Sequence, residues 1–194
     1  MNSPDIIEAL KPLIHTLEKL NIAYYIGGSI ASSAYGAFRA TRDVDMVFHI
    51  KPQHVDALVR ELESDYYIDK EMILDAIHRQ ASFNIIHLKT MFKIDGFVLK
   101  QRSYDQQAFQ RKRKDYLSEE MAFSIFLASP EDTILSKLEW YKAGNLVSDR
   151  QWQDILGVMR VQKDRLDIAY LKKWGEQLGI LDLLEKAFLE TPVK

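Results

Sequence analysis

The sequence contains no cysteine among its 194 residues. The absence of thiols excludes a disulfide framework, a thiolate metal site and a cysteine nucleophile, and such a chain suits a reducing compartment. A chain of this length can bury a core large enough to fold without cross-links. We therefore expect one domain, or one domain with a helical extension, stabilised by burial of apolar side chains.

Long apolar runs and an excess of charge of one sign are lacking as well. The most apolar stretch, MAFSIFLAS, is far shorter than the roughly 18 residues of a membrane-spanning helix, so we expect no membrane partner. The N-terminal MNSPDIIEAL has no basic region followed by an apolar stretch, which predicts no signal peptide and a cytoplasmic location. The 26 basic and 28 acidic residues nearly cancel, which argues against a broad positive surface for nucleic acid.

One dense basic cluster stands out against this balance. It is QRKRK, residues 110–114, at the end of a stretch, SYDQQAFQRKRK, that we expect to be helical. Short basic clusters are more often solvated helix ends than binding sites, and both interpretations stay open here. Any contact with nucleic acid would have to be local.

The spacing of apolar residues predicts alternating helices and strands up to residue 128 and helices alone after it. Ser129-Pro130-Glu131-Asp132 is typical of a helix start, and about four helices are expected from there to the end. The predicted fold class is α/β (α+β), a core over residues 1–128 with a mixed β-sheet flanked by helices, plus a helical C-terminal lobe over residues 129–194. The helices expected in the core are 6–20, 30–38, 52–64 and 69–77, and the strands are 22–26, 44–50, 83–88, 92–99 and 121–127.

Two glycines and a serine follow the first predicted strand. A strand that ends in Gly27-Gly28 and turns into a helix capped by Ser29 would leave backbone N–H groups and the positive end of a helix dipole at one spot. Such a spot favours a phosphate group, and glycine lets the phosphate oxygens approach the backbone. The same three residues are also ordinary turn residues, so a nucleotide-binding turn and a plain turn both stay open at this point.

Two aspartates open the next strand. Asp43 and Asp45 are two residues apart, so both side chains leave the same face of a strand while Val44 and Met46 face the core. At about 4 Å and an effective dielectric constant near 20, two carboxylates repel by roughly 4 kcal/mol. Such a pair needs a proton, a cation or a metal ion. Taken alone, the pair could equally be a solvated loop.

A third aspartate shifts the balance towards a metal site. Asp95 lies inside the predicted strand 92–99, where a charged residue is unfavourable unless it has a role. If that strand neighbours the Asp43 strand, three carboxylates meet. Oxygen ligands of this kind favour Mg²⁺ or Mn²⁺, and three such acids facing a phosphate site suit two-metal phosphoryl transfer, with Asp95 as a ligand and a proton acceptor.

These residues together resemble the DNA polymerase β-like nucleotidyltransferase superfamily, whose pattern is a glycine-serine turn, a paired acid and a third acid. Here that pattern is Gly27-Gly28-Ser29, then Thr41-Arg42-Asp43-Val44-Asp45, then Asp95. The downstream SPEDTILSKLEWYKAG and SDRQWQDILGVM are similar to the AbiEii-type branch, known as toxins of toxin–antitoxin and abortive-infection systems. The resemblance implies a nucleoside triphosphate substrate, an RNA acceptor and a cognate antitoxin protein as partners.

The resemblance also implies roles for a lysine and an acid beyond the core. The positions that match are Lys137 and Asp154. A lysine beside a triphosphate would neutralise developing charge, and an acid nearby could orient it. Without the resemblance, both would be ordinary residues flanking an apolar stripe. Arg42 is either a phosphate contact or a charge partner of Asp43.

The sequence thus predicts a metal-dependent nucleotidyltransferase that moves a nucleoside monophosphate from a triphosphate to a hydroxyl on RNA, such as tRNA, or on a protein. Two alternatives remain. One is transfer to a small molecule such as an aminoglycoside. The other is a nucleotide-binding regulatory or antitoxin-like protein without turnover, against which the three aspartates count because binding alone does not need all of them.

Overall fold

The computed structural model describes residues 4–37, 41, 43–118 and 123–191. Their contacts divide the chain into two units. The described residues of Met1–Gly27 and Thr41–Leu127 form the first, here called the sheet unit, and those of Gly28–Ala40 and Ala128–Lys194 form the second, the helical unit. The division into folding domains at residues 1–128 and 129–194 stays a proposal.

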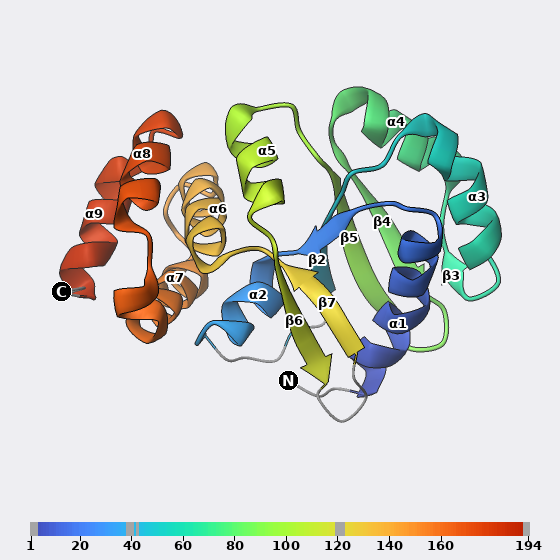
Figure 1. Cartoon of the computed structure of the whole chain (residues 1–194), viewed down its shortest axis with the longest axis horizontal. Coiled ribbons are helices and arrows are strands. Elements are labelled where there is room, and N and C mark those ends of the chain that lie inside the picture. The colour runs from blue at the N-terminus through green and yellow to red at the C-terminus, as the bar shows by residue number, and fades with distance from the viewer. Residues whose placement is uncertain (1–3, 38–40, 42, 119–122, 192–194) are drawn as a thin grey trace. The chain divides into compact units, whose positions relative to one another are not determined.

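The sheet unit is built on a seven-stranded sheet with the strand order β3-β4-β5-β2-β1-β7-β6 (Figure 1). β1 is parallel to β7 and β2 is parallel to β5, while the other neighbouring strands are antiparallel. The predicted α/β fold with a mixed sheet is confirmed. The strands are β1 (Tyr24–Ile26), β2 (Asp43–Phe48), β3 (Tyr66–Tyr67), β4 (Ser82–His87), β5 (Phe92–Val98), β6 (Arg113–Ser118) and β7 (Phe123–Leu127).

Helices accompany the sheet and make up the second unit (Figure 1). In the sheet unit they are α1 (Pro4–Lys19), α3 (Pro52–Leu62), α4 (Lys70–Arg79) and α5 (Ser103–Gln110). In the helical unit they are α2 (Gly28–Ala34), α6 (Pro130–Ala143), α7 (Asp149–Gln162), α8 (Ile168–Gln177) and α9 (Leu181–Glu190), with a 3₁₀ turn at Lys163–Arg165. No helix among the described residues is long and apolar enough to cross a membrane.

The core of the sheet unit lies on one face of the sheet. Alternate residues of β2 and β5, such as Met46 and Ile94, are fully buried, and α1 contributes Leu10 and Leu13 to the same core. The phenol of Tyr66 on β3 donates a hydrogen bond of 2.7 Å to the carbonyl of Ala9 and ties the sheet edge to α1. Because strand side chains alternate between faces, the residues between these core positions project to the opposite face.

The helical unit contains a helix from early in the chain. α2 packs on α6 and α7, the hydroxyl of Tyr35 donates to the carbonyl of Ala128 at 2.9 Å, and the Gln162 amide donates to the carbonyl of Tyr35 at 3.2 Å. The segment after β1 therefore belongs by its contacts to helices that lie about a hundred residues later in the chain.

Most predicted elements are confirmed, and the two exceptions have separate causes. The expected helix over SYDQQAFQRKRK is wrong in its last four residues, since α5 ends at Gln110 and Arg113 begins β6. β6 lies at the edge of the sheet, so its polar residues show no apolar alternation. The two-residue β3 is too short to produce a periodic signal. Residues 38, 121 and 122, at the ends of two predicted elements, lie outside the described residues.

Candidate active site

The three predicted acids lie on two neighbouring strands. β2 and β5 run parallel, and in their register Asp45 is the partner of Asp95 while Asp43 is the partner of Lys93. Because Asp43 and Asp45 are two residues apart in β2, and Asp45 pairs directly with Asp95, all three side chains leave the same face of the sheet. Val44 between them is fully buried on the other face. The two strands are neighbours, which is the condition on which the predicted grouping of the three acids depended.

Asp43 and Asp95 have different polar neighbours. The hydroxyl of Thr41 donates to Oδ1 of Asp43 at 2.8 Å, and it also lies 3.1 Å from the Asp43 carbonyl oxygen. The ammonium of Lys93 forms an ion pair of 2.6 Å with Oδ1 of Asp95, whose side chain keeps 22% of its surface exposed. A bound ligand could therefore reach the carboxylate of Asp95 from the solvent.

Gly27 joins the first strand to this row of acids. Its backbone N–H donates to the carbonyl of Asp45 at 2.9 Å, one residue beyond the last paired residue of β1. This amide is used in the sheet, so Gly27 contributes the turn rather than a free donor to any phosphate. A methyl group on Gly27 would only touch the Tyr25 ring at 3.7 Å, which is ordinary contact.

The next two residues of the predicted turn begin α2 in the helical unit. Gly28 has a φ of 51°, a left-handed conformation that glycine adopts at little cost. Ser29 is buried inside the first turn of α2, where its carbonyl accepts a 3.1 Å hydrogen bond from the Ser32 hydroxyl. The predicted phosphate-binding role of Gly27, Gly28 and Ser29 stays a proposal. Arg42 lies outside the described residues.

The donor chemistry of the acids suits a hard divalent ion. Three carboxylates supply only oxygen atoms, which Mg²⁺ and Mn²⁺ prefer, and their strands bring them to one face in direct register. Among the described residues, however, no group of three or more His, Asp or Glu side chains is placed closely enough to hold a metal. Backbone positions and donor types therefore fit the ion, while the side chains of this structure do not converge on one point.

Lys137 and Asp154 come together inside the helical unit. The ammonium of Lys137 on α6 lies 2.8 Å from a carboxylate oxygen of Asp154 on α7. The two side chains are only 8% and 7% exposed. The sequence placed these residues on successive helices by resemblance alone, and the structure pairs them. A buried ion pair of this kind is a structural element whether or not it also takes part in chemistry.

The start of α6 carries a buried polar network that the sequence indicated only as a helix cap. The Ser129 hydroxyl donates to Oδ2 of Asp132 at 2.5 Å and accepts from the Asp132 amide, while the phenol of Tyr170 donates to Oδ1 of Asp132 at 2.7 Å. The backbone amide of Asp167 donates to Glu131 at 3.0 Å. Glu131 and Asp132 lie in the first turn of α6, where the positive end of the helix dipole stabilises negative side chains.

Two residues beside the acids were not predicted. Lys93 lies two residues before Asp95 on the same face, and Asn84 of β4 is the register partner of Asp95 on its other side. Lys93 could have been found from the alternation of β5 alone, because it lies two residues before Asp95. Asn84 requires the tertiary structure, since no local pattern specifies which strand lies beside β5.

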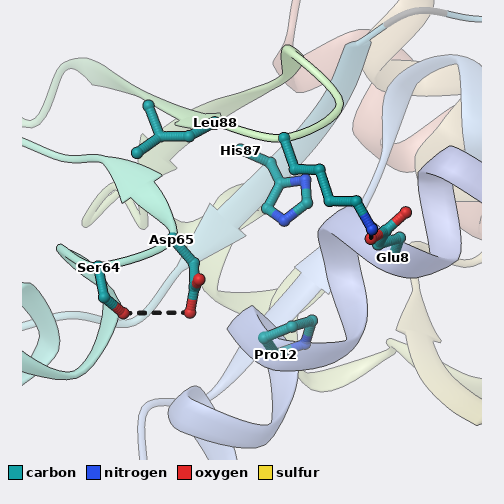
Figure 2. A pocket seen from close by; sticks show the side chains of 7 residues that line it. Glu8, Pro12, Ser64, Asp65, His87 and Leu88 are labelled. Atoms are coloured by element: carbon teal, nitrogen blue, oxygen red, sulfur yellow. Dashed lines mark hydrogen bonds and ion pairs between the residues drawn. The ribbon is translucent and has the colours of Figure 1, made fainter.

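A surface cavity of about 510 Å³ lies elsewhere in the sheet unit. Figure 2 shows Glu8 and Pro12 on α1 and Ser64, Asp65, His87 and Leu88 around it. Lys89, which also lines it, forms an ion pair with Glu8. None of the predicted site residues lines this cavity.

Similarity to known proteins is found for the fold but not for the sequence. No protein-family model matches the sequence, and no curated protein is similar to it in sequence. The structure is similar to that of the antibiotic-resistance factor ANT(2'')-Ia, with a TM-score of 0.60, 11% identity and coverage of 95% of this chain and 99% of that one. The chain has a nucleotidyltransferase fold.

Two further structures share this nucleotidyltransferase fold. The lincosamide antibiotic adenylyltransferase LnuA, bound to lincomycin, has a TM-score of 0.52 at 14% identity and covers 83% of this chain and 98% of its own. An antigenic nucleotidyltransferase-like protein from Paracoccidioides brasiliensis has a TM-score of 0.55 at 18% identity and covers 96% of this chain and 94% of its own. At sequence identities of 11–18%, these similarities show a shared fold alone.

Proposed function

We propose that this chain is a metal-dependent nucleotidyltransferase that moves a nucleoside monophosphate from a nucleoside triphosphate to a hydroxyl acceptor. The observation that carries the proposal is the parallel register of β2 and β5, which puts Asp45 beside Asp95 and Asp43 on the same face. A fold shared with nucleotidyltransferases supports it.

Asp43, Asp45 and Asp95 would hold two magnesium or manganese ions. Bound there, the ions would supply positive charge to the triphosphate and lower the pKa of the attacking hydroxyl. Asp95 accepts the hydroxyl proton, the acceptor oxygen bonds to the α-phosphorus, and the bond from that phosphorus to the bridging oxygen of pyrophosphate breaks. The ion pair of Asp95 with Lys93 must open for the carboxylate to serve in this way.

RNA is the acceptor that we propose first. Arg113 and Lys114 of the QRKRK cluster are exposed on the edge strand β6, where a local contact with a phosphate backbone is accessible. A small-molecule acceptor is the second candidate, because two of the structures with this fold are described as an antibiotic-resistance factor and a lincosamide adenylyltransferase. The AbiEii-type branch, a toxin role and an antitoxin partner stay predictions that rest on the sequence resemblance.

The roles of Gly28, Ser29, Lys137 and Asp154 are proposals about the helical unit and need tests of their own. The chemistry of the acids is tested first. Purified protein is incubated with each α-labelled nucleoside triphosphate, Mg²⁺ and total RNA, and in parallel with an aminoglycoside and with lincomycin. We expect label on one acceptor class with the wild type and a loss of about 10³-fold or more with Asp45→Asn.

Asp56→Asn is the matched control. It removes one carboxylate from the same unit, at an exposed ion pair with Lys70 on the helices rather than on the acid-bearing strands. Transfer by Asp56→Asn should equal that of the wild type. Label that persists in a folded Asp45→Asn protein contradicts the proposed chemistry. Metal-dependent triphosphate binding without transfer to RNA, protein or small molecule would instead favour the regulatory alternative.

A further inference from the structure

One cation lies within the acid cluster itself. Lys93 is the single basic residue of β2 and β5, whose sequences are DVDMVF and FKIDGFV. Its register partner across the sheet is Asp43, and the residue two positions on along its own strand is Asp95. The four side chains of Asp43, Asp45, Lys93 and Asp95 therefore occupy the corners of one rectangle on one face of the sheet.

Charge makes this arrangement informative. Three carboxylates on neighbouring positions of two strands repel one another, and the ammonium of Lys93 offsets part of that repulsion. The contact is direct, since Nζ of Lys93 lies 2.6 Å from Oδ1 of Asp95. That oxygen cannot accept a divalent ion at full strength while it also accepts the ammonium, and the two cations repel each other.

We propose that Lys93 is a built-in counter-ion that holds Asp95 when no metal is bound and competes with metal for it. Lys93 is thus a positioning residue, and the inference rests on the proposed function of the three acids. With a metal held by Asp95, the ammonium of Lys93 would be released from that carboxylate beside Asp43. Lys93 would then be able to donate to an oxygen of the triphosphate, so metal and nucleotide would bind more tightly together than separately.

The affinity for Mn²⁺ alone tests the first half of this proposal without any turnover. The free ion is measured by electron paramagnetic resonance during titration of the purified protein. In Lys93→Met, which keeps most of the length of the side chain but removes its charge, the Kd for Mn²⁺ should fall by about tenfold, because a unit cation a few Å from the ion is gone. Lys93→Arg keeps the charge and should bind Mn²⁺ no more tightly than the wild type.

A second titration tests the coupling. An α,β-methylene triphosphate, which cannot transfer its nucleotide, should tighten Mn²⁺ binding more in the wild type than in Lys93→Met. Lys70→Met is the matched control, since it also removes one ammonium that is paired with an aspartate, here on α3 and α4. Its Kd for Mn²⁺ should match that of the wild type.

The outcomes separate the two proposals. An affinity for Mn²⁺ that is unchanged or weaker in Lys93→Met overturns the counter-ion role. If Mn²⁺ binds to the wild type and not to Asp45→Asn, the proposed function still stands in that case. A wild type that binds no Mn²⁺ at millimolar concentration overturns the proposed function and this inference with it. Thermal unfolding shows that each variant is folded, and Lys93→Gln replaces Lys93→Met if the latter does not fold.

Discussion

At the scale of single residues, the buried pair of Lys137 and Asp154 allows a structural role to be separated from a catalytic one. Lys137→Met leaves the Asp154 carboxylate buried without the ammonium that lies 2.8 Å away. We expect the free energy of unfolding to fall by about 3–5 kcal/mol, as measured by urea denaturation.

The double variant Lys137→Met/Asp154→Leu removes both charges and should recover at least half of that loss, because no isolated buried charge remains. Transfer activity of this folded double variant is then informative. Full activity would restrict the pair to stability, whereas loss of transfer in a stable protein would support the role that the resemblance implies. A single variant as stable as the wild type would contradict the predicted cost of burial.

Tyr66 gives a prediction for alkaline pH. Burial raises the pKa of its phenol well above the usual value near 10, so the folded protein holds this proton to higher pH than the unfolded chain. Stability from this group is complete below pH 10 and is lost as pH rises above it, by at most about 1.4 kcal/mol per pH unit. Tyr66→Phe should lose less stability than the wild type between pH 10 and pH 11.5 in urea denaturation.

The neutral-pH stability of Tyr66→Phe provides the control. The phenol donates to the carbonyl of Ala9 at 2.7 Å, so its removal should cost about 1 kcal/mol at pH 8. Lysine titration in the same alkaline range affects both proteins alike, and the difference between their slopes isolates Tyr66. Equal slopes would show that the phenol titrates in the folded protein as it does in the unfolded chain.

At the scale of elements, β5 depends on a glycine for its packing. A Cβ on Gly96 would lie 2.8 Å from the ring of Phe83 and 3.0 Å from that of Phe48, two rings whose centroids are 5.3 Å apart. Gly96→Ala therefore forces a shift in a packed core, and we expect the free energy of unfolding to fall by about 1–3 kcal/mol. Chemical denaturation measures the change.

A double variant identifies the cause of that loss. Phe83→Leu removes the ring edge nearest to Gly96, so Gly96→Ala should cost less in the Phe83→Leu background than in the wild type. Strict additivity of the two changes would mean that the clash is relieved elsewhere. Asp95 directly precedes Gly96 in β5. Transfer activity of a folded Gly96→Ala protein therefore shows whether the packing of β5 also controls the position of a proposed metal ligand.

At the scale of the whole molecule, ligand binding should appear as stability. A ligand that binds only the folded state at a hundred times its Kd raises the free energy of unfolding by about 2.7 kcal/mol. For a chain of this size each kcal/mol corresponds to roughly 2–4 °C in Tm. We expect the correct nucleoside triphosphate with Mg²⁺ to raise the Tm by several degrees in a thermal scan, and Asp43→Asn/Asp45→Asn to abolish the rise.

The comparison among nucleotides adds specificity to this measurement. Mg²⁺ with inorganic phosphate, and triphosphate with EDTA, are controls for non-specific ion effects. An equal rise in Tm for the wild type and the double variant would place the nucleotide away from the acids. A rise confined to one base would identify the substrate before any acceptor is known.

Much of this arrangement could be predicted from local sequence, because its signals are local. The alternation of Asp43 and Asp45 with buried Val44 and Met46 follows from the two-residue period of a strand, and the structure confirms it. Ser129 caps α6 as its sequence indicated, accepting from the Asp132 amide at 3.1 Å. Such features depend on a few neighbouring residues and on backbone geometry.

Other features depend on partners that are distant in the chain. The parallel register of Asp45 with Asp95, the ammonium of Lys93 within the acid cluster and the grouping of α2 with α6 and α7 are decided by the tertiary structure. Strand pairing and helix packing join segments of which neither carries a label for the other, so no local pattern specifies them. The sequence by itself determined which residues are acidic, which are buried and which form turns. Only the tertiary structure decided which of them lie next to one another, because strand pairing and helix packing join distant segments.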